Sequence, residues 1–274
     1  MSVLPTIGPS LLFCPANRPA RFEKALSAAD AVIIDLEDAI AHDDDEKSSA
    51  RETVREHLRS DPDKFFVRIN GLDSPWYAAD VDMLRDVGAT KVVLPKVESA
   101  GQLLKTPDLT VIALCETVRG VVNSGEIAQA ANCAALFFGA EDLTADLGGR
   151  SSRSPSGAYH SPIENARSQV LFAAKAAGKA AIDAVFLDIR DSEALEAESR
   201  FACDMGFAAK GCIHPDQVQP IRRAYAPSDE QITWARGLLD AVAVNGPGVF
   251  QYQGQMVDKP LYQHAHTIMT RTEN

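Results

Sequence analysis

Eight short apolar runs rich in Val, Ile and Phe recur along most of the chain, and segments with helical spacing separate them. An alternation of strand and helix predicts a parallel sheet, because each helix carries the chain back to the edge where the next strand starts. The predicted strands are Ser10 to Cys14, Ala31 to Leu36, Phe65 to Asn70, Lys91 to Lys96, Thr110 to Glu116, Ala134 to Gly139, Ile182 to Asp188 and Phe207 to Ile213.

The connecting segments have the features of amphipathic helices. Pro19 to Ala29 follows Asn17, a residue type that caps helix N-termini, and Asp43 to Leu58 carries acids first and bases later, as the helix dipole favours. Pro162 to Ala177 and Ser192 to Met205 carry apolar residues on one face and polar residues on the other. We therefore predict a helix after most of the strands.

Eight strand and helix units favour a closed barrel over an open sheet. A doubly wound open sheet more often has five or six strands and a glycine-rich first turn, whereas no G-x-G-x-x-G follows the first strand here. The length of 274 residues fits one such barrel. The predicted fold class is α/β, a (β/α)8 TIM barrel with a short C-terminal extension.

The barrel is expected to occupy residues 1–225, and residues 226–274 are expected to form a C-terminal helix and tail. The tail folds over its own barrel or packs on a neighbouring subunit, and both arrangements remain open. Residues 148–162, rich in Ser, Gly and Pro, exceed the usual length of a βα loop and are interpreted as a mobile active-site loop.

Composition narrows the class of protein. Apolar residues make up 46% of the chain and charged residues 24%, which is ordinary for a soluble globular protein and excludes disordered and fibrous classes. The net charge of −11, with no basic cluster, argues against nucleic acid as a partner. No apolar stretch is long enough for a membrane span or a signal peptide, so we expect a cytoplasmic protein. The five cysteines lack a C-x-x-C pair and are interpreted as reduced core residues.

Acidic residues follow several of the predicted strands, where β/α barrels place their catalytic groups. They are Asp35, Glu37, Asp38, Glu98, Glu116, Glu141, Asp142 and Asp188. Carboxylates that converge on one barrel mouth resist ionisation unless a cation compensates them. Oxygen ligands without a matching Cys or His set favour Mg²⁺, which takes one or two carboxylates and keeps several waters. We predict Glu116 and Asp142 as the metal ligands; Asp35, Asp38 and Asp188 either share this function or cap helices and form ion pairs.

Three basic residues also lie at predicted strand ends. The planar guanidinium of Arg68 is suited to bidentate binding of a substrate carboxylate, and an ion pair with Glu37 or Asp38 is the alternative. Lys96 is either a Schiff-base lysine or, as we prefer, a charge partner of the carboxylates. We interpret His214, which precedes a proline, as a structural residue.

With these residues in place, the sequence resembles the citrate lyase β subunit-like (CitE-like) branch of the HpcH/HpaI aldolase superfamily, nearly from end to end. The motifs that carry the resemblance are Leu12-Phe13-Cys14-Pro15-Ala16, Ile34-Asp35-Leu36-Glu37-Asp38, Val67-Arg68-Ile69-Asn70, Leu94-Pro95-Lys96-Val97-Glu98, Cys115-Glu116-Thr117, Phe138-Gly139-Ala140-Glu141-Asp142-Leu143, Ile213-His214-Pro215 and Gly254-Gln255-Met256-Val257-Asp258. Each motif is short, but their order along the chain makes a chance match improbable.

The resemblance implies a Mg²⁺-dependent homotrimer that cleaves or forms a carbon–carbon bond next to a coenzyme A thioester. It implies Glu116 and Asp142 as metal ligands, and Arg68 as the catalytic residue that holds the carboxylate of a 2-oxo acid. The oxygens of that acid complete the metal shell beside Glu116, which thereby also binds substrate. Asp258 is implied as a catalytic acid that exchanges a proton with the acetyl methyl group in a neighbouring subunit.

The expected reaction cleaves a 3-hydroxyacyl-CoA such as citramalyl-CoA to acetyl-CoA and a 2-oxo acid, or runs in the direction of synthesis. The phosphates of coenzyme A require cations, for which Arg18 and Arg21 after the first strand are the candidates, with Arg150 and Arg153 in the long loop. A Schiff-base aldolase that uses Lys96 and a non-catalytic subunit of a citrate lyase complex are the two alternatives.

Overall fold

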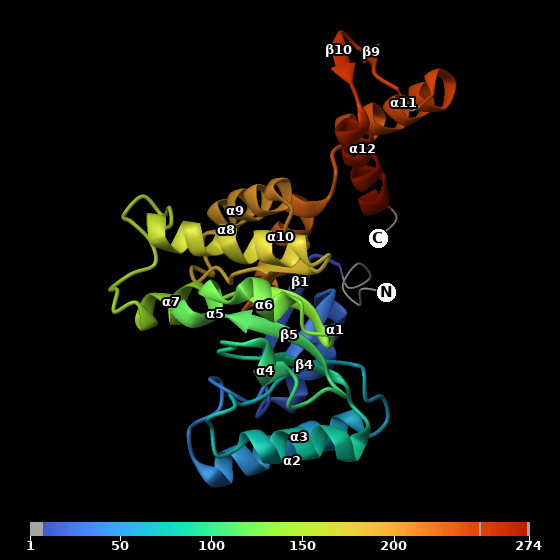
Figure 1. Cartoon of the computed structure of the whole chain (residues 1–274). Coiled ribbons are helices and arrows are strands. Elements are labelled where there is room, and N and C mark those ends of the chain that lie inside the picture. Colours follow the sequence, from blue (N-terminus) through green and yellow to red (C-terminus); the bar gives the residue numbers. More distant parts are fainter. Residues whose placement is uncertain (1–7, 247, 273–274) are drawn as a thin grey trace. The chain divides into compact units, whose positions relative to one another are not determined.

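The computed structural model describes residues 8–246 and 248–272. The chain divides into two compact units, Met1–Ile221 and Arg222–Asn274. The sequence placed the division after residue 225, at the end of helix α10 (Val218–Tyr225); the observed division falls inside this helix. Figure 1 shows the elements of both units.

Eight parallel strands close into a barrel in the order β1 to β8, which confirms the predicted (β/α)8 TIM barrel (Figure 1). β1 pairs with β2 on one side, Leu11 opposite Ala31, and with β8 on the other, Leu12 opposite Cys212, so the sheet has no open edge. The strands are β1 (Ser10–Pro15), β2 (Ala31–Asp35), β3 (Phe66–Arg68), β4 (Lys91–Leu94), β5 (Thr110–Cys115), β6 (Cys133–Phe138), β7 (Ala180–Asp183) and β8 (Ala209–Cys212).

Helices follow the strands on the outside of the barrel. They are α1 (Phe22–Ala28), α2 (Asp44–Leu58), α3 (Tyr77–Val87), α4 (Ala100–Leu103), α5 (Val118–Val122), α6 (Ser124–Ala128), α7 (Ala140–Asp146), α8 (Ser161–Ala176) and α9 (Ser192–Met205). The Asp43 side chain caps α2 by accepting the N–H groups of Asp45 and Glu46. The prediction that Asn17 caps the first helix was wrong, because a 3-10 turn (Pro19–Arg21) precedes α1 and has Arg18 at its N-cap position.

The barrel interior is apolar through its lower layers and charged at its mouth. Alternate residues of a strand point to the same face, so the inward row of β2 continues from Ile33 to Asp35 and that of β3 from Phe66 to Arg68. The interior is filled by Leu11, Ala31, Ile33, Phe66, Val93, Ile112, Leu114, Ala135, Phe137, Ile182 and Ala209. The same two-residue step takes β5 from Leu114 to Glu116, which brings its carboxylate to the barrel mouth.

The seventh strand is shorter than predicted. β7 ends at Asp183, whereas the apolar run continues through Ala184 and Leu187 as irregular chain that lines a pocket. Asp188 is exposed, and its side chain accepts the N–H of Arg190. The prediction that Asp188 lies at the end of the seventh strand was therefore wrong. The apolar residues after β7 line the pocket, and a run of apolar residues in a sequence can indicate either a pocket lining or a strand.

A network of buried charges lies between the barrel and its outer helices. Lys210 on β8 is fully buried, and its ammonium donates to Asp183 at 2.8 Å, to the Ala184 carbonyl at 2.7 Å and to Glu198 at 2.9 Å. Arg167 on α8 binds both oxygens of Asp183 at 2.8 and 2.9 Å. Although burial raises the pKa of Asp183, Lys210 and Arg167 outweigh it and lower the pKa below its ordinary value.

The second unit is a helical hairpin with a small antiparallel sheet. Helices α11 (Asp229–Asn245) and α12 (Lys259–Thr272) flank strands β9 (Phe250–Tyr252) and β10 (Gln255–Val257). The sequence predicted α11 and a tail, and missed the hairpin and α12. The core of this unit contains Ala235, Leu238, Val257, Tyr262, Ala265 and Ile268. No helix among the described residues is long and apolar enough to cross a membrane.

We expect Lys210→Met to lower the free energy of unfolding by about 3–5 kcal/mol, because it leaves buried carboxylates short of a partner. Urea unfolding followed by circular dichroism measures the loss. Lys105→Met, at an exposed position on the barrel, is the control and should change stability by less than about 0.5 kcal/mol. Equal stability of the two variants would contradict the role given to Lys210.

Candidate functional site

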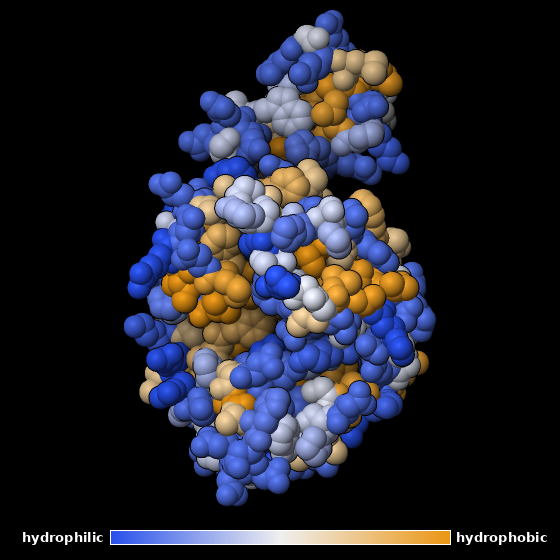
Figure 2. Space-filling model, turned by 90° about the vertical axis from the view of Figure 1, so that its left-hand side faces the viewer, coloured by the Kyte–Doolittle hydropathy of each residue, from blue (hydrophilic) through white to orange (hydrophobic). Residues whose placement is uncertain are grey.

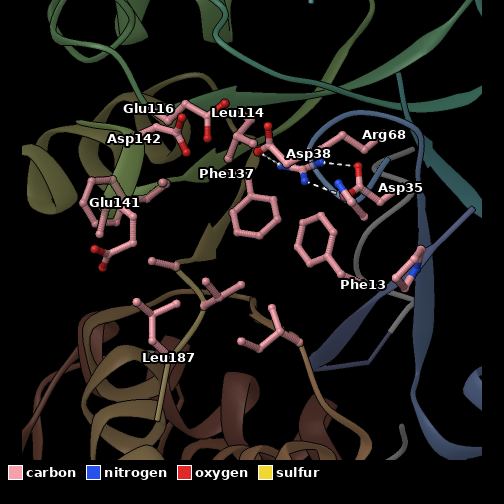
Figure 3. A pocket seen from close by; sticks show the side chains of 18 residues that line it. Phe13, Asp35, Asp38, Arg68, Leu114, Glu116, Phe137, Glu141, Asp142 and Leu187 are labelled. Atoms are coloured by element: carbon pink, nitrogen blue, oxygen red, sulfur yellow. Dashed lines mark hydrogen bonds and ion pairs between the residues drawn. The ribbon is translucent and has the colours of Figure 1, made fainter. Parts of the chain in front are cut away.

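A pocket of about 340 Å³ opens at the carboxyl end of the barrel strands. Figure 2 views the molecule from the side toward which the β5 arrow points in Figure 1, and shows a hollow with a hydrophobic interior, bordered by both hydrophilic and hydrophobic side chains. Its apolar lining includes Phe13, Leu114, Phe137, Leu187 and Ile213, and its charged lining includes Asp35, Asp38, Arg68, Glu116 and Asp142. Figure 3 shows Glu116 and Asp142 together at one place in the lining and Asp35, Asp38 and Arg68 together at another. Binding sites in β/α barrels occupy this end.

Glu116 and Asp142 come from neighbouring strands. Glu116 follows β5, and Asp142 lies in the first turn of α7, directly after β6. Their side chains lie next to each other in Figure 3. The Glu116 side chain is buried, and burial together with the negative charge of Asp142 raises its pKa to about 8. A further cation close to Glu116 would favour its charged form at neutral pH.

The donor chemistry of this pair fits Mg²⁺. Both groups offer carboxylate oxygens, and within residues 8–246 and 248–272 no group of three or more Asp, Glu, His or Cys side chains forms a fuller metal cluster. Mg²⁺ is commonly held by one or two carboxylates while water and substrate oxygens complete its shell. Burial and, after it, the neighbouring carboxylates of Asp142 and Glu37 raise the pKa of Glu116, and a bound cation would offset both effects. Glu116 and Asp142 would hold the ion.

Lys96, which follows β4, contacts three carboxylates of the site. Its backbone is left-handed, with φ of 51°, and this places its N–H 3.0 Å from Glu116 Oε1. Its ammonium lies 2.7 Å from Glu37 and 3.6 Å from Asp142. Although partial burial lowers the pKa of Lys96, the hydrogen bond to Glu37 and the surrounding carboxylates raise it above its ordinary value. A lysine kept protonated is a poor Schiff-base nucleophile, so the geometry favours the charge-partner interpretation.

Arg68 is held rigidly by acids of the β2 segment. Its Nε and Nη2 both donate to Asp35 at 2.7 Å, and its Nη1 lies 3.2 Å from Glu37 and 3.4 Å from Asp38. Asp35 also accepts the N–H groups of Glu37 and Ala39, each at 3.0 Å. Asp35 therefore orients the guanidinium, and the predicted ion pairs with Glu37 and Asp38 exist alongside Arg68's place in the pocket wall.

The remaining predicted site residues are not among those that line this pocket. Arg18 and Arg21 are exposed in the turn after β1 and do not line the pocket. Asp258 belongs to the second unit, where it is half-buried between β10 and α12 and its carbonyl accepts the N–H of Tyr262. The structure thus brings Arg68, Glu116 and Asp142 together in one pocket.

The long loop after α7 is tied to the rest of the barrel. Arg153, predicted as a phosphate-binding cation, is paired with Glu198 at 2.6 Å. Ser152 is buried and donates to Glu141, a pocket residue, at 2.8 Å. Arg150 is exposed. Of the two loop arginines, Arg150 has the more accessible guanidinium.

The sequence analysis missed the groups that lie behind the pocket. Lys47 on α2 is buried beneath the β2 segment, next to Asn70 and Asp80. A signal was present, because Lys47 shares a helix face with the buried residues Ala50 and Val54, at spacings of three and seven. A lysine in an apolar row requires acceptors inside the protein, and this indicates a buried polar network.

The chain is similar to proteins of one family over most of its length. A model of the HpcH/HpaI aldolase/citrate lyase family matches residues 9–215. A citrate lyase subunit beta-like protein of Mycobacterium tuberculosis (strain CDC 1551 / Oshkosh) is 47% identical over 264 residues, 96% of this chain and 95% of that protein. A (3S)-malyl-CoA thioesterase of Cereibacter sphaeroides (strain KD131 / KCTC 12085) is 34% identical over 275 residues, 96% of this chain and 94% of that protein.

Two crystal structures of CitE from M. tuberculosis have the same fold. The first, in complex with magnesium, acetoacetate and coenzyme A, has a TM-score of 0.92 and 46% identity, and the match covers 99% of this chain and 100% of that one. The second, in complex with magnesium and pyruvate, has a TM-score of 0.83 and 43% identity, covering 97% and 99%.

Gly139 tests the metal site without changing a ligand. A Cβ at this position would lie 2.6 Å from Glu116 Cβ and 2.8 Å from Glu116 Oε2, and φ of −113° accepts alanine, so Gly139→Ala displaces the carboxylate by steric contact alone. We expect its Mg²⁺ affinity, measured by calorimetry, to fall at least tenfold. Gly125→Ala, where an added Cβ meets nothing within 4 Å, is the control. Unchanged affinity in Gly139→Ala would remove Glu116 from the metal site.

Proposed function

Because this chain belongs to the HpcH/HpaI aldolase/citrate lyase family, we propose that it is a Mg²⁺-dependent carbon–carbon lyase acting on a 3-hydroxyacyl-CoA such as citramalyl-CoA. The products are acetyl-CoA and a 2-oxo acid, and the same site can run the reverse condensation. The observation that carries the proposal is the pair Glu116 and Asp142 beside Arg68 in one pocket. The bound magnesium, acetoacetate and coenzyme A of the M. tuberculosis CitE structure support it.

Each pocket residue has a defined task in this proposal. Glu116 and Asp142 hold Mg²⁺, which when bound supplies Lewis acidity to the oxygens of the 2-oxo acid. Arg68 binds the carboxylate of that acid, and Asp35 fixes the plane of the guanidinium. The apolar wall formed by residues such as Phe137 excludes water from the reacting carbon atoms.

Cleavage breaks the bond between the hydroxyl-bearing carbon and the carbon next to the thioester. The hydroxyl gives its proton to a water molecule as it becomes the carbonyl of the 2-oxo acid, and the bonding electron pair passes to the thioester as an enolate. Asp258 gives this enolate a proton, which completes the acetyl methyl group. We assign Asp258 this role in a homotrimer, and assign the phosphates of coenzyme A to Arg18 and Arg21.

Thioester hydrolysis is the second candidate activity. It is favoured by the 34% identity to (3S)-malyl-CoA thioesterase of Cereibacter sphaeroides. The two reactions differ in the bond that breaks: hydrolysis releases free coenzyme A and a hydroxy acid, whereas the lyase releases acetyl-CoA and a 2-oxo acid. A thiol reagent and a 2-oxo acid assay on the same reaction separate them. Turnover of free thioesters by the purified chain would also argue against a purely non-catalytic subunit.

Metal removal and Arg68→Lys together test the lyase. Chelation should abolish 2-oxo acid release from citramalyl-CoA, and added Mg²⁺ should restore it. Arg68→Lys loses the bidentate fork, so we expect kcat/KM to fall by about 10- to 100-fold, since hydrogen bonds to charged groups contribute about 1.5–3 kcal/mol. Arg59→Lys, an exposed position, is the matched control. Activity that survives complete chelation would overturn the proposal.

Asp258→Asn should lower kcat by about 100-fold or more, because it removes a positioned proton donor. Pyruvate binding to the Mg²⁺-loaded protein, measured by calorimetry, should stay the same. Asp240→Asn, an exposed position on α11 of the same unit, is the control. Mixing dissociated Asp258→Asn and Glu116→Gln subunits restores activity only if Asp258 serves a neighbouring barrel. Full activity of Asp258→Asn alone would remove this residue from catalysis.

A further inference from the structure

Lys47 is a fully buried lysine that ends beneath the charged side of the pocket. It projects from the first turns of α2, and its ammonium donates to the Leu36 carbonyl at 2.7 Å, the Glu37 carbonyl at 2.6 Å and Asn70 Oδ1 at 2.8 Å. Three acceptors satisfy all three N–H groups of an ammonium. Two of them are main-chain carbonyls of the segment that follows β2.

The acceptor Asn70 is itself fixed from behind. Its side-chain amide and its backbone N–H both donate to Asp80 Oδ2, at 2.6 and 2.9 Å. Asp80 on α3 is buried, and its carboxylate accepts a hydrogen bond from Arg51 Nε at 2.9 Å. The chain of contacts from Arg51 to Lys47 therefore links α2 and α3 to the ends of β2 and β3, and the Lys47 ammonium is the point at which they meet.

The groups that Lys47 holds contact Arg68, which lines the pocket, and Lys96. The Glu37 carbonyl accepts a hydrogen bond from the Lys47 ammonium, while the Glu37 carboxylate contacts Arg68 Nη1 at 3.2 Å and the Lys96 ammonium at 2.7 Å. The N–H of Leu36 donates to the Arg68 carbonyl at 2.9 Å. A shift of this segment by a few tenths of an ångström would move the carboxylates that orient Arg68.

We infer that Lys47 is a positioning residue for substrate binding: it fixes the main chain at Leu36 and Glu37 so that Asp35 and Glu37 present the Arg68 guanidinium to the substrate carboxylate. This inference rests on the proposed function of Arg68. Lys47 acts through the backbone, so its loss affects the carboxylate site more than the proposed metal ligands Glu116, after β5, and Asp142, in α7. Misplacement of an orienting group by about 1 Å can cost two orders of magnitude in rate.

The test compares Lys47→Met with Lys210→Met. Both lysines are fully buried and donate three hydrogen bonds, but those of Lys210 go to Asp183, the Ala184 carbonyl and Glu198 and none goes to the β2 segment. Pyruvate and Mg²⁺ are titrated separately by calorimetry at a temperature where both variants are folded. Lys47→Met should weaken pyruvate binding at least tenfold and change Mg²⁺ affinity by less than threefold. Lys210→Met should lose stability while its pyruvate affinity stays within about twofold of the parent.

Kinetics and amide exchange provide further readouts. In Lys47→Met the KM for the thioester should rise more than kcat falls, and Lys47→Arg, which keeps charge and donors, should lie between Met and the parent. The amides of Leu36, Glu37 and Ala39, which donate to Arg68 and Asp35, should exchange at least tenfold faster in Lys47→Met than in Lys210→Met.

Two outcomes would overturn the inference: equal loss of pyruvate affinity in Lys47→Met and Lys210→Met, or unchanged exchange of these amides. If instead the parent protein binds no pyruvate and cleaves no thioester, the proposed function fails. The exchange comparison then still decides whether Lys47 fixes the segment.

Discussion

Asp35, Glu37, Arg68 and Glu116 are buried at the barrel mouth, and each of these charged groups must face an opposite charge or a polar backbone group. Arg68 and Lys96 satisfy part of this requirement by contacts with Asp35 and Glu37. Acidic side chains still outnumber basic ones there, and burial together with Asp142 raises the pKa of Glu116. The need for a further cation follows from this imbalance, and a divalent ion bound by oxygens meets it.

Buried charges also lie on the outer side of the barrel wall, and they too are paired with opposite charges or polar groups. Strand residues that point outward meet helices, and two of these contact regions contain a fully buried lysine, Lys47 on α2 and Lys210 on β8. Each ammonium donates hydrogen bonds to side chains or main-chain carbonyls from several elements. These directional bonds fix the position of the loops, which apolar contacts alone would not do. The Lys210 network anchors the long loop through Glu198 and Arg153. The Lys47 network lies behind Glu37, whose carboxylate contacts Arg68 in the pocket.

The family relationship and the pocket constrain the chemistry to different degrees. Relatives of comparable coverage carry the names citrate lyase subunit beta-like protein and (3S)-malyl-CoA thioesterase. Both names concern acyl compounds with carboxylates, which agrees with a guanidinium and two neighbouring carboxylates in one cavity. One barrel can support both reactions, because the outcome depends on which bond the loops and the proton donors expose. The choice between the two lies with product analysis.

The sequence by itself determined the barrel and the charged strand ends. Eight apolar runs and their helical connections have a periodicity that local backbone geometry dictates, and a two-residue step from Leu114 to Glu116 places a carboxylate inward whatever the surroundings. The end of β7, the place of Asp188 and the hairpin after α11 were missed, because apolar composition does not tell a strand from a pocket wall or a short sheet. Only the tertiary structure decided which opposite charges meet. The pairing of Arg68 with Asp35, of Lys96 with Glu37 and of Lys47 with Asn70 joins residues 20 or more positions apart, and such contacts depend on side-chain direction in a closed barrel rather than on spacing along the chain.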